Sequence, residues 1–396
     1  MMKKTHICSF VTAALIALTA VSCVYPFTPD PEDGSGALVI EGDILLGDYT
    51  VVKLSHTAPV NAPKLSDDPP HGKVWVEDDS GVDYQGVADA TTTGKYLVDT
   101  RNADPGRRYR LHVVRLDDNR EYVSEWGEAP VVPEIDSLSY IKDFDRSRLN
   151  VALSMHSRGG SFFKWKYVEN WEFHAIYHAE LKYNPPQQNI YWGNVGDGEI
   201  VGMPYPGTYY CYGHEESSEI MIFSTEKQTD DRFVDLEFRP INRDDVKISY
   251  IYHIDVYLEP LSADAYKYWE TVKSNSEYNG NLFAPNPSEL VGNIRCVQDP
   301  DELVMGYISV AQMAHKDLVI RHYDARFYKD SAPYEEPVVV SRGQWRQYYN
   351  EGYLPYSYYE VPGDLSQTNW AKARCVDCKR MGKGKAVYER PDDWAY

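Results

Sequence analysis

The segment that most resembles a catalytic motif runs from His214 to Ser218 and reads HEESS. It begins like the zinc-protease motif HExxH, in which two histidines one helical turn apart bind zinc and the glutamate acts as general base. Ser218 stands where the second histidine ligand is required. We therefore discard a zinc-protease function and predict no metal site and no cofactor.

Four cysteines in the body of the chain could form cross-links: Cys211, Cys296, Cys375 and Cys378. Cys375 and Cys378 have the spacing of half a zinc site or of a redox pair. Zinc needs a second pair of ligands, and a redox pair normally begins a helix, whereas Pro/Gly-rich sequence surrounds this pair. We predict disulfides and leave all three connectivities open, although a Cys375–Cys378 bond would close an unusually tight ring.

Other enzyme classes are harder to judge from sequence. The chain has no nucleophile elbow, phosphate-binding loop or glycine-rich dinucleotide motif. Glycoside hydrolysis needs two carboxylates that meet only in space, and the chain has 60 acidic residues. A hydrolase of glycans or peptides is therefore kept as an alternative to the non-enzymatic function that we predict.

Aromatic residues are concentrated near the C-terminal end and could form a flat binding platform. Flat rings offer a sugar or a peptide a large contact area at little entropic cost. The alternative is that the same rings cover the core of the second domain. The candidates are Trp345, Tyr348, Tyr349, Tyr353, Tyr356, Tyr358 and Tyr359.

The first residues have the features of an export signal. Lys3 and Lys4 precede an apolar stretch, residues 7–21, that is too short for a stable membrane-spanning helix. Residues 20–23 read AVSC, with a small residue directly before Cys23. We predict that residues 1–22 are a lipoprotein signal peptide, that Cys23 carries the acyl chains, and that residues 23–36 form a flexible tether.

The charge of the chain limits its partners. The net charge is −20, and removing Lys3 and Lys4 with the signal leaves −22. Such a field repels phosphate backbones, so we predict no nucleic-acid binding. Contact with the membrane is expected through the lipid alone, because the same field repels anionic lipid surfaces and no stretch after Cys23 approaches the roughly 18 consecutive apolar residues of a spanning helix.

The body reads as a mainly β fold of two domains. Residues 37–132 show short alternating runs broken by turn residues, which predicts an N-terminal β-sandwich of immunoglobulin or transthyretin-like type. In residues 108–114, alternation places Tyr109, Leu111 and Val113 on one face. Residues 130–133 read PVVP, and two prolines so close together favour an extended boundary.

Residues 133–396 are predicted to form a larger β domain. One helix is expected near residues 262–274, where Ser262 can cap its start and Ala265, Trp269 and Val272 share a face. The last seventy residues have many Tyr, Pro and Gly and little periodicity. We expect this Tyr/Pro-rich segment to wrap the second domain as an irregular tail.

Several segments, in this order and spacing, resemble the DUF4249 lipoproteins of Bacteroidetes. They include residues 261–270 (LSADAYKYWE), 282–287 (LFAPNP), 291–296 (VGNIRC), 299–302 (DPDE) and 305–309 (MGYIS). Residues 38–42, 133–138, 375–378 and 391–394 fit the same pattern, so the resemblance covers nearly the whole mature chain. No catalytic residue is established for this family, and none is carried over.

The resemblance implies an outer-membrane lipoprotein that assists a TonB-dependent transporter. We therefore expect an accessory or ligand-capture subunit, with a structural subunit of an envelope assembly as a further alternative. In these bacteria, acidic residues directly after the lipidated cysteine favour transport to the cell surface. Here they come later, at Asp30, Glu32 and Asp33, so a periplasmic orientation stays open beside the expected surface location.

Overall fold

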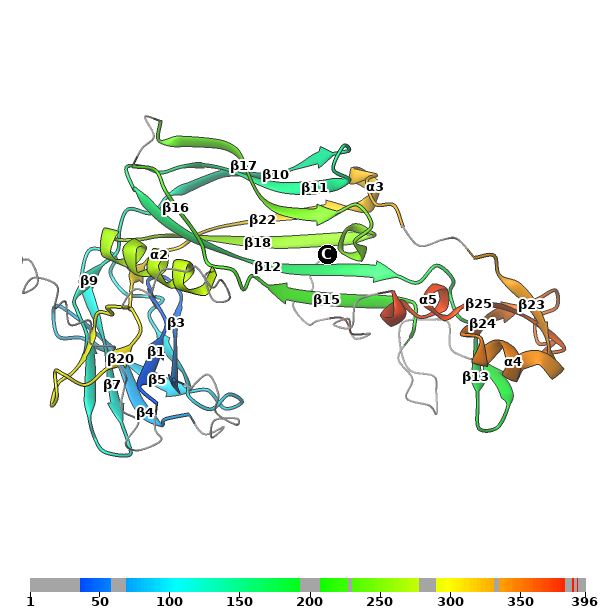
Figure 1. The fold of residues 1–396 in the computed structure, drawn as a ribbon, viewed down its shortest axis with the longest axis horizontal. Coiled ribbons are helices and arrows are strands. Elements are labelled where there is room, and N and C mark those ends of the chain that lie inside the picture. The colour runs from blue at the N-terminus through cyan, green and yellow to red at the C-terminus, as the bar shows by residue number, and fades with distance from the viewer. Residues whose placement is uncertain are drawn as a thin grey trace, which may run out of the picture.

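A computed structural model gives the fold. It describes residues 36–57, 69–192, 207–226, 230–277, 290–330 and 335–381, together with Val387 and Arg390. Cys23, the signal peptide and all but the last residue of the tether lie outside the described residues. Figure 1 shows three β-rich units in a row, which we call the barrel, the sandwich and the C-terminal module. The prediction of a mainly β fold is confirmed.

The barrel is a ten-stranded sheet that curls until its two end strands, β19 and β20, meet. Its path runs β19-β8-β7-β4-β5-β6-β3-β1-β20, with β9 paired to β7. Its early strands are β1 (Leu38–Glu41), β3 (Tyr49–His56), β4 (Gly72–Asp78), β5 (Asp83–Ala88), β6 (Lys95–Asp99), β7 (Arg108–Arg115), β8 (Glu121–Ser124) and β9 (Gly127–Glu128). The predicted alternation in β7 is confirmed, because Tyr109, Leu111 and Val113 are all buried in the barrel core.

The barrel also contains a segment from much later in the chain. β19 (Ile294–Cys296) and β20 (Val304–Met305) close the sheet, and β21 (Val310–Ala311) pairs in parallel with β2 (Ile44–Leu45). Tyr122 of β8 donates to Glu302 Oε1 at 2.9 Å, which ties this segment to β8. The first unit is thus discontinuous in sequence, and it is one curled sheet where we expected a sandwich of residues 37–132.

The sandwich begins at β10, directly after the predicted boundary segment. One sheet has the order β10-β11-β17, and the other has the order β15-β12-β18-β22 with β16 also paired to β12. These strands are β10 (Glu134–Asp143), β11 (Arg148–His156), β12 (Phe162–His174), β15 (Tyr210–Glu216), β16 (Met221–Ser224), β17 (Arg232–Asn242), β18 (Ile251–Pro260) and β22 (Ala314–Arg321). Leu149 and Val151 of one sheet pack with Ile254 and Val256 of the other.

Three short elements complete the sandwich. Helix α2 (Ala263–Glu277) lies where the sandwich meets the barrel (Figure 1), and the amide of Ala265 donates to Ser262 Oγ at 3.1 Å. The predicted helix and its cap are therefore confirmed. The turn η1 (Val246–Ile248) and the short helix α3 (His322–Ala325) lie toward the other end.

The C-terminal module is more regular than the tail that the sequence suggested. It has a sheet of order β23-β25-β24, made of β23 (Val338–Ser341), β25 (Gln367–Lys372) and β24 (Tyr353–Tyr358). The hairpin β13 (Leu181–Asn184) and β14 (Asn189–Trp192) joins it, and Leu181, Tyr183 and Ile190 share its core. The helical elements are η2 (Arg342–Gln344), α4 (Trp345–Asn350), α5 (Ala373–Val376) and η3 (Cys378–Arg380).

Candidate functional site

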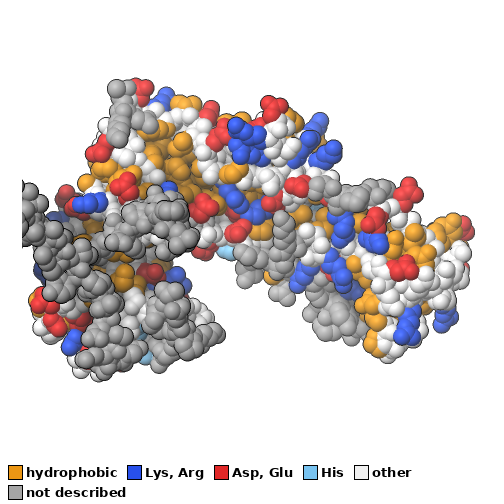
Figure 2. Space-filling model, viewed as in Figure 1, with side chains coloured by type: hydrophobic (Ala, Val, Ile, Leu, Met, Phe, Trp, Pro, Cys, Tyr) orange, Lys and Arg blue, Asp and Glu red, His pale blue; other side chains and the backbone are white. Residues whose placement is uncertain are grey.

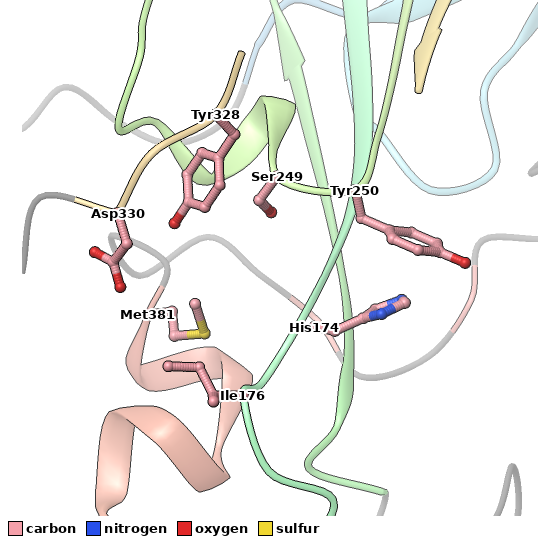
Figure 3. Close-up of a pocket in the computed structure, with 7 residues that line it drawn as sticks. All are labelled: His174, Ile176, Ser249, Tyr250, Tyr328, Asp330 and Met381. Carbon is pink, nitrogen blue, oxygen red and sulfur yellow. The ribbon is translucent and has the colours of Figure 1, made fainter. Parts of the chain in front are cut away.

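The candidate site is a hollow where the far end of the sandwich meets the C-terminal module (Figure 3). Its volume is about 200 Å³. Strand β12 ends beside it, the turn between η1 and β18 forms one wall, and the chain after α3 and after η3 forms the rest. The lining residues are His174, Ile176, Ser249, Tyr250, Tyr328, Asp330 and Met381.

One wall of the hollow is aromatic. The ring of His174 lies 3.8 Å from that of Tyr250 and 4.7 Å from that of Tyr210, measured between centroids. Nε2 of His174 is 2.7 Å from Glu172 Oε1, which holds the imidazole in place. Tyr250 is 44% exposed, so its ring is available to a ligand. A flat surface of this kind suits ring stacking or a cation.

Across from the His174 ring, Figure 3 shows the oxygen atoms of Tyr328 and Asp330 above the apolar Met381, with Ser249 between Tyr328 and Tyr250. Burial and the nearby charge of Asp330 raise the pKa of Tyr328 to about 12, so its hydroxyl keeps its proton. Asp330 accepts from Arg374 Nη2 at 3.1 Å, and Ser249 Oγ donates to the Val246 carbonyl at 2.7 Å. The hollow therefore combines a mostly apolar lining, to which Ile176 and Met381 contribute, with a few hydroxyl and carboxylate groups, an arrangement that can bind and orient a small molecule.

A disulfide stands next to this hollow and fixes the module to the sandwich. Cys211 of β15 is bonded to Cys378, which begins η3, across 167 residues of sequence. The predicted disulfide chemistry is thus confirmed for one pair. Cys296 and Cys375 are buried free thiols, and burial raises the pKa of each. Cys378 is paired with a distant residue and not with its near neighbour Cys375.

The residues of the predicted aromatic platform all lie in the C-terminal module, but most of them face its cores. Trp345 and Tyr358 are buried in one core, against which Tyr348, Tyr349 and Tyr353 pack, while Tyr356 packs against a second core. Tyr359 is 44% exposed. Tyr356 also stacks on Tyr177 at 4.5 Å, beside the end of β12. The rings therefore serve mainly to hold the module together, which was the alternative reading.

His214 and Glu215, from the discarded HEESS motif, lie on β15 and not on a helix. His214 Nδ1 is 2.8 Å from Asn170 Oδ1, and Glu215 accepts from Lys247 Nζ at 2.6 Å. In the part of the chain that the structure describes, no group of three or more His, Cys, Asp or Glu side chains is arranged to hold a metal ion. Likewise, none of the described helices is long and apolar enough to cross a membrane.

A second cluster of charged groups lies inside the sandwich. Glu169 of β12 is fully buried, and its carboxylate accepts from Arg239 Nε at 2.7 Å, Arg239 Nη2 at 2.9 Å, Lys247 Nζ at 2.7 Å and Tyr252 Oη at 2.5 Å. Arg239 belongs to the opposite sheet. Because four donors satisfy the carboxylate and join both sheets, this cluster has a structural role.

Sequence reasoning did not find the hollow. Its residues come from four places in the chain, 174–176, 249–250, 328–330 and 381, and none of them forms a local motif. The sequence offered one signal, an aromatic residue at the end of each of two strands: His174 ends β12, and Tyr250 directly precedes β18. That signal becomes specific only when the pairing of β12 with β18 is known.

Comparison with known proteins gives a family but no function. No curated protein matches this chain. Among solved structures, a DUF4785 family protein from Legionella pneumophila is 8% identical over 59% of this chain and 52% of its own length, with a TM-score of 0.18. The chain thus spans about half of the length of that protein. Residues 24–317 match the family described as a domain of unknown function, DUF4249. The chain belongs to the DUF4249 family.

Proposed function

We propose that this chain is an outer-membrane lipoprotein of Bacteroidetes that captures a small ligand for a TonB-dependent transporter, or otherwise assists such a transporter. The leader sequence and the position of Cys23 support the lipid anchor. No catalytic step is part of the proposal. The observation that carries it is the hollow between the sandwich and the C-terminal module, on the side of the sandwich away from the barrel (Figure 3).

The order of the units fits this role. In the proposed protein the anchor precedes the barrel in the chain, which would place the barrel nearest to the lipid and the hollow on the far side of the sandwich. Acyl chains would confine the protein to the plane of the membrane, which raises its effective concentration near a partner without high intrinsic affinity.

A pull-down tests the transporter partnership. The tagged chain is purified from solubilised outer membranes, and its partners are identified by mass spectrometry. We expect a TonB-dependent transporter to be enriched with the wild type and lost with Cys23→Ala, which removes the anchor. If no transporter is recovered with the wild type, the result would count against the proposal.

The ligand hollow needs its own test. Native mass spectrometry of the purified protein is expected to detect a bound small molecule, and Tyr250→Ala is expected to abolish that signal. Tyr359→Ala is the matched control, because both tyrosines are 44% exposed and only Tyr250 lines the hollow. Equal ligand signals in both variants would rule out the hollow as the binding site.

A structural role in an envelope assembly is the second candidate. Figure 2 shows apolar side chains gathered on the sandwich where Figure 1 places β16 and β17. Phe223 and Phe233, in ring contact at 5.9 Å, are only partly buried at this open side of the two sheets. Such a patch favours a protein interface. Recovery of envelope proteins other than a transporter in the same pull-down would support this role.

A further inference from the structure

A buried charge cluster joins the barrel to the sandwich. Lys164 of β12 lies with its ammonium nitrogen 2.9 Å from Asp43 Oδ2 and 2.9 Å from Glu259 Oε2. Asp43 belongs to the barrel, between β1 and β2, whereas Lys164 and Glu259 face each other across β12 and β18 of the sandwich. The ring of Trp269, from α2, lies over the ammonium at 4.4 Å.

The cluster holds more negative charge than positive charge. Two carboxylates share a single ammonium group, and Glu259 is only 2% exposed. Among the described residues, Asp43 Oδ1, Glu259 Oε1 and Trp269 Nε1 are buried atoms without a hydrogen-bond partner. A carboxylate oxygen that is buried and unpaired is costly while it is charged, and much less so once it carries a proton.

We propose that the joint between the barrel and the sandwich binds one proton, carried by Glu259, and that loss of this proton on the alkaline side loosens the joint. With the proton in place, one carboxylate and one ammonium balance each other. Without it, an uncompensated negative charge stays buried between the two units. Separating the units lets water reach the carboxylates, so the charged form favours the looser arrangement.

The surroundings of Glu259 agree with this assignment. Burial, followed by the charge of Asp43, raises the pKa of Glu259 to about 7 against the opposing effects of Lys164 and Lys166 on β12. The two carboxylates outweigh burial at Lys164 and raise its pKa, so the ammonium keeps its charge over the same range. From α2 and the barrel segment after β20, the nearby titratable groups are Tyr268 and Tyr307, and burial raises the pKa of both phenols.

The direction of the effect follows from the sign of the shift. The folded joint holds its proton up to a pH of about 7, whereas an exposed glutamate loses it near 4.5. The joint is therefore tightest on the acid side and loosens as the pH rises through this interval. This inference concerns the orientation of the units and does not depend on the lipid anchor or on the transporter.

Distance measurements between the two units test the proposal. Spin labels at Val87→Cys in the barrel and Val234→Cys in the sandwich use two positions that are both 69% exposed. Distances between the two labels are measured by pulsed electron–electron double resonance on the mature chain in detergent, from about pH 5.5 to about pH 8.5. We expect a narrow distance distribution on the acid side and a broader or shifted one on the alkaline side, with the change complete slightly above pH 7.

Three variants make the result specific. Glu259→Gln should keep the narrow distribution at every pH, and Asp43→Asn should do so as well, because Lys164 alone then balances Glu259. Glu215→Gln is the matched control, since it removes a carboxylate from another lysine, Lys247, inside the sandwich. This control should keep the wild-type transition.

If Glu259→Gln fails to fold, Asp43→Asn carries the test. A wild-type distribution that does not change with pH, or an unaltered transition in both joint variants, would overturn the proposal.

Discussion

Glu169 shows how much of the sandwich depends on one side chain. Its carboxylate is 0% exposed and joins β12 to Arg239 of the opposite sheet and to Lys247 of η1. Burial acts to raise the pKa of Glu169, but the hydrogen bonds and charges of Arg239 and Lys247 outweigh it and hold the pKa below the usual value of 4.5. The charged form is therefore the one that the fold stabilises.

Replacement of Glu169 by glutamine should destabilise the protein strongly, by about 3–5 kcal/mol, because Arg239 loses its carboxylate partner and the buried Lys247 keeps only Glu215. Chemical denaturation followed by tryptophan fluorescence measures the change. Glu215→Gln, whose side chain is 39% exposed beside the same Lys247, should cost only about 0–1 kcal/mol. Similar losses in the two variants would contradict a special role for the buried carboxylate.

The same residue predicts a dependence of stability on acid. A carboxyl whose pKa is lowered by folding stabilises the protein above its unfolded pKa of 4.5, and this contribution is lost as the pH falls through the lowered value. Stability measured at decreasing pH below 4.5 should therefore fall less steeply in Glu169→Gln than in the wild type. Parallel curves for the two proteins would show that another group controls acid unfolding.

At the scale of elements, the closure of the barrel depends on a close approach of two strands. Gly306, directly after β20, has a φ of +134°, and a Cβ built there would lie 2.0 Å from the carbonyl oxygen of Ile40 in β1. The parallel pairing of β1 with β20 therefore needs glycine at this position.

Gly306→Ala should reduce stability by more than about 1 kcal/mol, because the methyl group forces β20 away from β1. Thermal unfolding followed by circular dichroism measures the loss. Gly343→Ala is the matched control, since a Cβ at Gly343 meets no atom within 4 Å and the backbone there is not in the left-handed region. An unchanged melting temperature for Gly306→Ala would mean that β20 pairs differently.

The elements also show what sequence patterns can and cannot predict. Alternation in β7 and the cap of α2 are local signals, and both predictions are confirmed. Strands β19, β20 and β21 belong to the barrel because they pair with strands that lie more than 150 residues earlier. No local pattern encodes such a pairing. The same reason hid the hollow, whose walls meet only after β12, β18 and the C-terminal module are assembled.

At the scale of the whole molecule, one covalent bond fixes the C-terminal module beside the hollow. The Cys211–Cys378 disulfide crosses from β15 of the sandwich to η3. The two units also share the stacked rings of Tyr177 and Tyr356. The position of Met381, and with it one wall of the hollow, follows from this link, because its amide donates to the Cys378 carbonyl at 2.9 Å.

Replacing Cys211 and Cys378 together by serine should lower the stability by about 2–4 kcal/mol and expose the module to proteases. Denaturation with guanidinium and limited proteolysis of the region between α3 and β23 measure the two effects. Wild-type protein under reducing conditions serves as the control and should behave like the double variant. Equal resistance of all three samples would show that noncovalent contacts alone hold the module.

The proposed function depends on a lipid attached to Cys23 at the end of the export signal. The direct measurement is metabolic labelling with an alkyne analogue of palmitate, combined with membrane fractionation of the wild type and of Cys23→Ala. We expect the wild type to carry the label in the outer-membrane fraction and the variant to lose both the label and that location. An unlabelled wild type, or a variant that fractionates as the wild type does, would contradict the account.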